Sequence, residues 1–201
     1  MSKTIISCVG DSITWGAGST DPETISWPAQ MQNILGSEFE VLNFGNSGRS
    51  LMSTTAEPYF ADEMATHSLN SNPDIILFML GTNDAQKLVW DTQLFEHEYP
   101  LAIEQYVKLP SEPKVYLMTP PRSYHLCTGD TWHIDNELIV DKIIPCITKT
   151  AKAYGLEIID VYSFTDGHRE FFIEDGVHPN DHGYTQLAKY ISGRLAESLN
   201  L

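Results

Sequence analysis

A serine that follows an apolar run is the first candidate for chemistry in this sequence. Ser12 stands in Gly10-Asp11-Ser12, after residues 4–9, whose apolar and β-branched side chains predict a buried strand. Open α/β sheets bind ligands at the carboxyl ends of their strands, which is where this serine is expected. Glycine, aspartate and serine are also common in turns. A serine hydroxyl is a weak nucleophile that needs a base and donors for an oxyanion, so its partners must lie elsewhere in the chain.

An aspartate and a histidine three residues apart offer those partners near the end of the chain. Asp175 and His178 occur in Asp-Gly-Val-His-Pro, just before a predicted helix. A histidine can take the serine proton, and an aspartate can hold the imidazole in the required tautomer. Standing alone, such a pair is more often a set of ordinary exposed loop residues than a catalytic one.

Two further loops of small residues follow predicted strands. Residues 45–50 follow the alternating segment 39–44, and residues 81–84 follow 75–80, the most apolar run of the chain. Glycine lets a backbone N–H approach a ligand closely, although it is also common in tight turns. Asn83 can donate from its amide without introducing a charge, and Asp84 is expected to brace the loop. Because parallel strands share their direction, these loops should meet Ser12 at one edge of the sheet.

The elements that must position these loops alternate along the chain. Five strands separated by helices predict one domain, residues 1–201, with a three-layer α/β/α sandwich, a parallel sheet and right-handed crossovers. We expect the strands at 4–9, 39–44, 75–80, 114–118 and 156–161. We expect five helices. The first runs from Ser26, which can cap it, to residue 35, and the second covers 57–69. The others lie within 91–109, where Pro100 limits the start, at 134–154 with a bend or break at Pro145, and after residue 180. Loops are expected around Trp15 and over the active edge at 123–133.

Taken together, four blocks of the sequence resemble the SGNH (GDSL-type) hydrolase family over residues 5–180. The blocks are Gly10-Asp11-Ser12-Ile13, Asn43-x-Gly45-x-x-Gly48, Gly81-Thr82-Asn83-Asp84 and Asp175-x-x-His178-Pro179. The first block has Ile13 where the family has leucine, which concerns packing only.

The resemblance implies a role for each matching residue. Ser12 would be the nucleophile, His178 the general base and acid, and Asp175 the residue that orients the imidazole. The oxyanion hole would consist of the backbone N–H groups of Ser12 and Gly48 and the side-chain amide of Asn83. The family also implies the flavodoxin-like strand order 2-1-3-4-5.

We therefore predict a serine esterase that releases short acyl groups, with acetyl preferred. Gly48-Arg49-Ser50 resembles the corresponding loop of carbohydrate acetylesterases in the family, and we predict substrate contacts from Asp11, Trp15 and Arg49. Thioesterase or lysophospholipase activity is the alternative, followed by a non-catalytic carbohydrate-binding protein on the same fold. Tryptophans can stack on sugar rings but usually pack in the core. The four tryptophans are Trp15, Trp27, Trp90 and Trp132.

The charge balance limits the partners. With 12 basic and 27 acidic residues the formal net charge is −15, which repels nucleic acid and anionic membrane surfaces and favours a neutral or cationic substrate. No apolar run is long enough to cross a bilayer, and the first strand begins too early for a signal peptide, so a cytoplasmic location is the default, although a trimmed leader would look the same. The oligomeric state stays open.

No disulfide, metal or cofactor is expected. The three cysteines, Cys8, Cys127 and Cys146, are widely spaced and odd in number. A metal site from His125, Cys127, Asp130 and His133 matches no standard zinc spacing. The remaining histidines are expected on the surface or in loops. They are His67, His97, His168 and His182.

Overall fold

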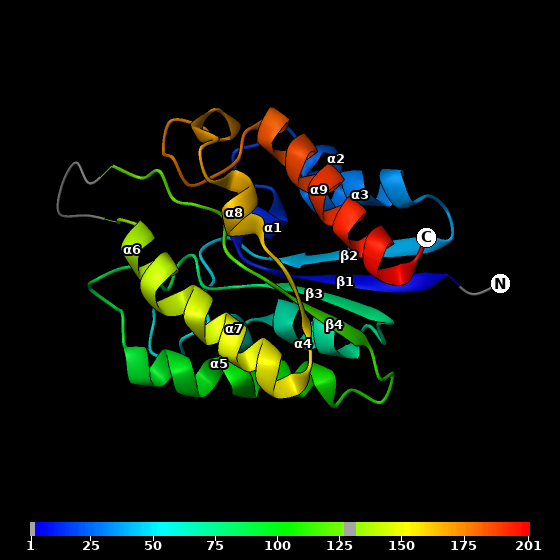
Figure 1. Ribbon diagram of the computed structural model, residues 1–201, viewed down its shortest axis with the longest axis horizontal. Coiled ribbons are helices and arrows are strands. Elements are labelled where there is room, and N and C mark those ends of the chain that lie inside the picture. The colour runs from blue at the N-terminus through cyan, green and yellow to red at the C-terminus, as the bar shows by residue number, and fades with distance from the viewer. Residues whose placement is uncertain (1–2, 127–131) are drawn as a thin grey trace.

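A parallel five-stranded sheet forms the centre of the molecule. The computed structural model describes residues 3–126 and 132–201 (Figure 1). The strand order is β2-β1-β3-β4-β5, with every neighbouring pair parallel, which confirms the predicted α/β fold and the order that the family resemblance implied. The strands are β1 (Thr4–Gly10), β2 (Phe39–Gly45), β3 (Ile75–Met79), β4 (Lys114–Met118) and β5 (Glu157–Ile159).

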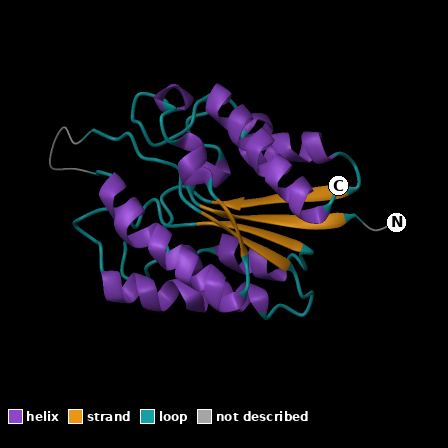
Figure 2. Ribbon diagram, viewed as in Figure 1, coloured by secondary structure: helices purple, strands orange, loops and turns teal. Residues whose placement is uncertain are grey.

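Helices cover both faces of this sheet (Figures 1 and 2). One layer contains α3 and α9, which pack against each other, and the opposite layer contains α4, α5 and α7. The α-helices are α1 (Ser12–Trp15), α2 (Pro22–Ile25), α3 (Trp27–Leu35), α4 (Glu63–Asn70), α5 (Thr92–Val107), α6 (Asn136–Leu138), α7 (Ile144–Tyr154), α8 (Val161–Thr165) and α9 (Asp181–Leu199). Short helical turns are η1 (Tyr59–Ala61), the π-helical η2 (Ile139–Ile143) and η3 (Arg169–Phe171). Among the described residues, none of the helices is both long and apolar enough to cross a membrane.

The central position of β3 in the sheet explains why its sequence is apolar throughout. Its five residues are all buried, and their side chains alternate between the two cores. Leu77 and Met79 belong to the core shared with α3 and α9, whereas Ile76 and Phe78 belong to the core shared with α5 and α7. A parallel strand covered on both faces requires apolar residues at every position, which is why this run lacks polar alternation.

Helix α5 contradicts the expected limit at Pro100. The helix begins at Thr92 and continues through Pro100, which lies inside it. Asp91 caps its start by accepting a hydrogen bond from the Leu94 amide at 3.0 Å. Proline removes one intrahelical hydrogen bond, but the buried rings of Tyr99 and Tyr106 on either side pack against the core and hold the helix together.

Other helix boundaries differ from the expectations in ways that local chemistry explains. Ser26 precedes α3 but its side chain makes no capping bond. The segment predicted as a helix from 134 is divided into α6, η2 and α7, and the last division falls beside Pro145, where a bend or break is expected, with Pro145 in the first turn of α7. A proline at that point has no N–H to donate, and the wider π-helical turn directly before it accommodates the change. The helix predicted at 57–69 is also divided, with η1 preceding α4, which begins after the cap Asp62.

Candidate active site

The strand register brings three polar turns to one edge of the sheet. Gly10 pairs with Gly45 in β2 and with Met79 in β3, so the residues after these three positions leave the sheet at the same level. This carboxyl edge lies at the left in Figure 1, opposite the two termini. The predicted meeting of the loops therefore follows from the pairing of strands that are distant in sequence.

Ser12 begins the short helix α1, whereas the sequence suggested a loop at this point. Asp11 caps this helix, because its Oδ1 accepts a hydrogen bond from the Ile13 amide at 2.9 Å. The first N–H groups of a helix have no acceptor within it, so the Ser12 amide is available as a donor. Ser12 itself is only 6% exposed, so it is nearly buried at the carboxyl edge of the sheet.

Two glycines allow α1 to pack directly on the strands. A β-carbon on Gly10 would overlap the Thr14 side chain, and one on Gly45 would overlap the Trp15 backbone. These glycines therefore end β1 and β2 because a larger residue would push α1, and Ser12 with it, away from the sheet.

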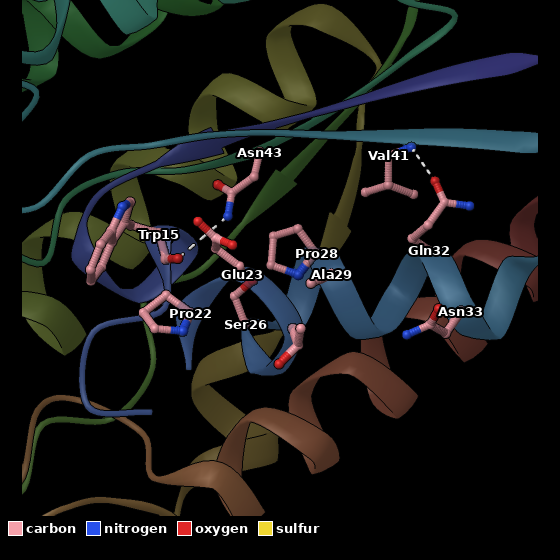
Figure 3. Close-up of a pocket in the computed structure, with 11 residues that line it drawn as sticks. Trp15, Pro22, Glu23, Ser26, Pro28, Ala29, Gln32, Asn33, Val41 and Asn43 are labelled. Carbon is pink, nitrogen blue, oxygen red and sulfur yellow. Dashed lines mark hydrogen bonds between the residues drawn. The ribbon is translucent and has the colours of Figure 1, made fainter. Parts of the chain in front are cut away.

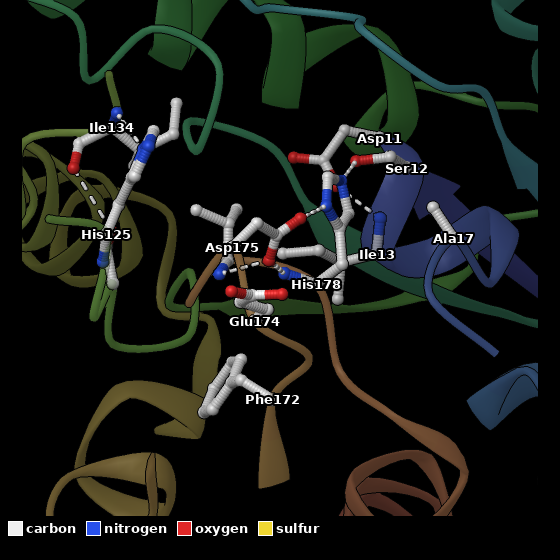
Figure 4. Close-up of polar contacts among 12 residues, drawn as sticks. Asp11, Ser12, Ile13, Ala17, His125, Ile134, Phe172, Glu174, Asp175 and His178 are labelled. Carbon is white, nitrogen blue, oxygen red and sulfur yellow. Dashed lines mark hydrogen bonds and ion pairs between the residues drawn. The ribbon is translucent and has the colours of Figure 1, made fainter. Parts of the chain in front are cut away.

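Ser12, His178 and Asp175 form a continuous chain of hydrogen bonds (Figure 4). The Ser12 Oγ lies 2.9 Å from Nε2 of His178, and Nδ1 of His178 lies 2.6 Å from Oδ2 of Asp175. The other carboxylate oxygen, Oδ1, accepts hydrogen bonds from the amides of Val177 at 2.8 Å and His178 at 3.0 Å. The backbone amides of the same turn thus fix the Asp175 carboxylate, and this carboxylate orients the His178 ring.

These contacts keep Asp175 ionised. Partial burial alone would raise the pKa of Asp175, but the hydrogen bonds from the His178 ring and from the Val177 and His178 amides outweigh it and lower this pKa to about 2. An ionised carboxylate beside Nδ1 favours the tautomer that leaves Nε2 free to accept the Ser12 proton.

Gly48 and Asn83 lie together at the edge of a cavity of about 290 Å³. Gly48 has φ +78°, a left-handed conformation that favours glycine, and a β-carbon there would collide with the Glu57 carboxylate. One N–H of the Asn83 amide is donated to the Arg49 carbonyl at 2.9 Å, which fixes its orientation. The second N–H of this amide has no acceptor among the described residues.

Asp84 stabilises the loop after β2, residues 46–52, by hydrogen bonds to its backbone. Its carboxylate is fully buried and accepts hydrogen bonds from the amides of Leu51 at 2.8 Å and Met52 at 2.7 Å. Burial raises the pKa of Asp84 to about 6, although these two amides offset part of the effect. The loop that carries Gly48 is therefore tied to the turn that carries Asn83.

Two of the three predicted substrate contacts are engaged elsewhere. The Arg49 guanidinium pairs with Glu57 at 2.8 Å and with Asp62 at 2.9 Å, so it stabilises the loop rather than reaching toward Ser12. Asp11 is fully buried, so a substrate has no access to its carboxylate. Burial raises the pKa of Asp11 to about 6, offset in part by the Ile13 amide. The sequence could not indicate either engagement, because Asp62 lies in another segment and the burial of Asp11 depends on how the edge of the sheet is packed.

Trp15, the third predicted contact, is 44% exposed and lines a different groove of about 640 Å³ (Figure 3). Figure 3 places Trp15 at one end of this groove, beyond Asn43 and Pro22, with Asn33 at the other end. The Asn43 amide is used within the protein, since it donates to the Thr14 carbonyl at 3.0 Å. Trp15 therefore borders a groove that is lined by residues of α2, α3 and β2 and does not include Ser12.

Sequence reasoning did not single out Trp132 from the other tryptophans, but the structure does. Its ring lies nearly parallel to the His178 ring, with an angle of 9° and 6.2 Å between centroids. Trp27 is fully buried, and Trp90 is partly buried against the ring of Phe95. No pattern in the sequence relates Trp132 to His178, because they lie in separate loops.

The metal site considered from the sequence includes Cys127 and Asp130, which lie outside the described residues. In His125, Nδ1 accepts a hydrogen bond from the Ile134 amide at 3.1 Å. Within residues 3–126 and 132–201, no group of three or more histidine, cysteine, aspartate or glutamate side chains is placed to hold a metal ion. Cys8 and Cys146 are buried free thiols.

A parallel α/β sandwich with a serine, a histidine and an aspartate joined at its carboxyl edge defines a class of acyl-transfer hydrolases. The chain matches the GDSL-like lipase/acylhydrolase family over residues 8–186, and it belongs to that family.

Known relatives agree with this membership. An acetylxylan esterase of Xylanibacter ruminicola is 30% identical over 211 aligned residues, which cover 94% of this chain and 42% of that protein. The chain thus spans less than half the length of this relative. A solved carbohydrate acetylesterase of Sinorhizobium meliloti has a TM-score of 0.76 at 21% identity, covering 97% of this chain and 99% of that one. A family two carbohydrate esterase of Clostridium thermocellum, solved with cellohexaose, has a TM-score of 0.74 at 17% identity, covering 98% of this chain and 65% of that one. At these identities the two solved structures support the fold alone.

Proposed function

We propose that this chain is a serine esterase that hydrolyses acetyl esters, with a carbohydrate as the alcohol. The observation that carries the proposal is the hydrogen-bonded sequence from Ser12 Oγ through His178 to Asp175, with distances of 2.9 and 2.6 Å. Likeness to an acetylxylan esterase along 94% of the chain supports the acyl group and the class of alcohol.

In the first half of the reaction the Ser12 oxygen attacks the ester carbonyl carbon while its proton moves to Nε2 of His178. Asp175 stays ionised and stabilises the imidazolium that forms. The tetrahedral intermediate then collapses: the bond from carbon to the alcohol oxygen breaks, and His178 donates its proton to that oxygen. The products are the free alcohol and an acetylated Ser12.

In the second half water replaces the alcohol. His178 takes a proton from the water as its oxygen attacks the acetyl carbon, and a second tetrahedral intermediate forms. When it collapses, the bond to Ser12 Oγ breaks and His178 returns the proton to the serine. The same imidazole thus serves as base and acid in both halves.

The negative charge on the carbonyl oxygen requires donors in both halves. The Ser12 amide, the Gly48 amide and the second N–H of the Asn83 side chain are suited to this role, and each such donor contributes ~3–4 kcal/mol. The contacts of α1 and of the loop that Asp84 holds already orient these three donors, so the donors need little reorganisation during the reaction.

The decisive experiment compares the wild type with Ser12→Ala on acetyl and octanoyl nitrophenyl esters and on acetylated sugars. We expect the wild type to favour acetyl esters and to be labelled by a serine-directed phosphonate, and Ser12→Ala to lose both hydrolysis and labelling while its melting temperature stays within a few degrees. Turnover that survives in Ser12→Ala would refute the nucleophile. Faster turnover of octanoyl than of acetyl esters would favour a thioesterase or lysophospholipase instead.

A further inference from the structure

We propose that the cavity between Gly48 and Trp132 is the site of the leaving alcohol, and that Trp132 is the platform on which a neutral pyranose ring stacks. The inference rests on the proposed function, because it assigns the alcohol side of the same reaction. It begins from the position of the cavity of about 290 Å³. Its lining residues are Gly48, Ser50, Thr55, Ala56, Glu57, Asn83, Gln86, Val89 and Trp132.

The position of the base fixes which part of the ester this cavity receives. His178 must donate a proton to the alcohol oxygen, so the alcohol leaves from the side of the oxyanion hole that faces His178. Trp132 lies on that side, with its ring 6.2 Å from the His178 ring and nearly parallel to it. Because Trp132 also lines the cavity that Gly48 and Asn83 border, the cavity connects the oxyanion donors to the leaving-group side.

Trp132 is positioned by a contact with His125 and by the attachment of the segment that follows it. Its ring lies 4.7 Å from the ring of His125, measured between centroids. Three residues further, the Asp135 amide donates to the Ala85 carbonyl at 2.7 Å, and the Asp135 carboxylate pairs with Lys87 at 2.8 Å. The loop after β4 is thereby attached to the loop after β3. With 43% of its surface exposed, Trp132 presents a fixed aromatic surface to a ligand.

The remaining lining favours a ring that carries hydroxyl groups. Glu57 pairs with Arg49 through Oε2, and Gln86 donates its Nε2 to the Asn83 carbonyl at 2.7 Å. In the part of the chain that the structure describes, the Oε1 atoms of Glu57 and Gln86 accept no hydrogen bond. Both can accept from hydroxyl groups, as saccharides require, while the acidic side chain disfavours an anionic alcohol.

The size of the cavity limits the occupant further. Its volume of about 290 Å³ lies just below the usual range for small-ligand sites, which begins at about 300 Å³. One sugar ring is therefore a better match than a long acyl chain. A planar aromatic alcohol would also stack on Trp132, but it would leave the acceptors on Glu57 and Gln86 unused.

The test compares two acetyl esters that differ only in the alcohol, methyl xylopyranoside monoacetate and ethyl acetate. We expect Trp132→Ala to lower kcat/KM for the xyloside ester roughly tenfold, mainly through KM, and to change the value for ethyl acetate less than about twofold. Trp132→Phe should recover most of the loss, since it keeps an aromatic surface. Leu88→Ala is the matched control, because Leu88 is an exposed apolar residue of the neighbouring loop that does not line the cavity.

Each result decides the proposal. An equal loss on both esters would mean that Trp132 only supports His178, and no loss on either would mean that the alcohol lies elsewhere; both overturn it. Cyclohexyl acetate, a ring without hydroxyl groups, and phenyl acetate form further arms, and a loss on these as large as that on the xyloside ester would contradict a saccharide site. Calorimetric titration of Ser12→Ala with methyl xylopyranoside provides a readout that needs no hydrolysis. Binding that disappears on adding Trp132→Ala, but not Leu88→Ala, supports the subsite even if the wild type cleaves no ester, whereas no binding to Ser12→Ala would overturn it.

Discussion

Gly18 lies directly against His178. A β-carbon on Gly18 would come within 2.9 Å of the His178 Cβ and 2.6 Å of the Pro179 carbonyl oxygen, and the residue has φ +93°. The loop that follows Ser12 therefore packs against the backbone and Cβ of His178. A larger residue at this position must displace the turn that carries His178.

We predict that Gly18→Ala lowers kcat at least tenfold because it shifts His178 away from Ser12. Gly36 supplies a matched control, since it also has a positive φ, +80°, but no atom lies within 4 Å of its added β-carbon. Both substitutions carry a backbone penalty of about 1–3 kcal/mol. Steady-state kinetics on nitrophenyl acetate should therefore separate them: Gly36→Ala loses stability with kcat unchanged, and equal kcat values in the two variants would contradict the role of Gly18.

Asn83→Ala should lower kcat by ~10²–10³ with little change in KM, because the amide acts once negative charge has formed on the carbonyl oxygen. The substitution also removes the hydrogen bond to the Arg49 carbonyl, so the melting temperature must be measured on the same sample. If KM rose at constant kcat instead, Asn83 would be a ground-state binding residue, and the Ser12 and Gly48 amides would form the oxyanion hole without it.

The buried carboxyl group of Asp11 should give the free energy of unfolding a characteristic pH dependence. Burial raises its pKa to about 6 in the folded state, so the folded protein holds this proton more tightly than the unfolded chain between about pH 4 and 6. Its contribution to stability is complete below pH 4 and is lost as the pH rises through 6. Asp11→Asn keeps the acceptor for the Ile13 amide. As the pH rises from 4 through 6, we predict that the free energy of unfolding of this variant increases relative to that of the wild type by on the order of 1–3 kcal/mol.

Urea denaturation at several pH values measures this difference. Titrating groups that do not interact with Asp11 cancel in it, whereas Asp84, whose pKa is raised by burial and in part by the charge of Asp11, adds to it in the same direction. Asp62 is the control, because burial alone would raise its pKa but the Met64 amide, Asn46 and Arg49 lower it overall. Asp62 is therefore ionised in both states above about pH 5, and the difference for Asp62→Asn should stay constant from pH 5 to pH 7. A constant difference for Asp11→Asn as well would show that Asp11 is not perturbed.

Esterase activity should survive exhaustive treatment with EDTA. The proposed reaction uses an ionised aspartate, a histidine and hydrogen-bond donors, and none of its steps requires a Lewis acid. The measurement is the rate of nitrophenyl acetate hydrolysis before and after chelation and dialysis. If activity disappeared and returned with zinc, His125 and His133 would be the first residues to examine by substitution.

The sequence alone determined the sheet and the identity of its edge. The continuous apolar run of β3 and the short β-branched run of β1 indicate buried parallel strands whatever surrounds them, because only such strands need apolar side chains on both faces. The glycine-rich and polar blocks after these strands then indicated that Ser12, Gly48 and Asn83 meet, and the resemblance to the family added His178 to them.

Tertiary contacts decided what each neighbouring side chain does there. Arg49 is held by Asp62, Asp11 is fully buried, and Trp132 rather than Trp15 lies beside His178. Pro100 remains inside α5 for the same kind of reason, since packing of Tyr99 and Tyr106 outweighs a local preference. Sequence periodicity reports which side of an element is buried, but the pairing of side chains depends on how loops distant in the sequence cross at the edge of the sheet.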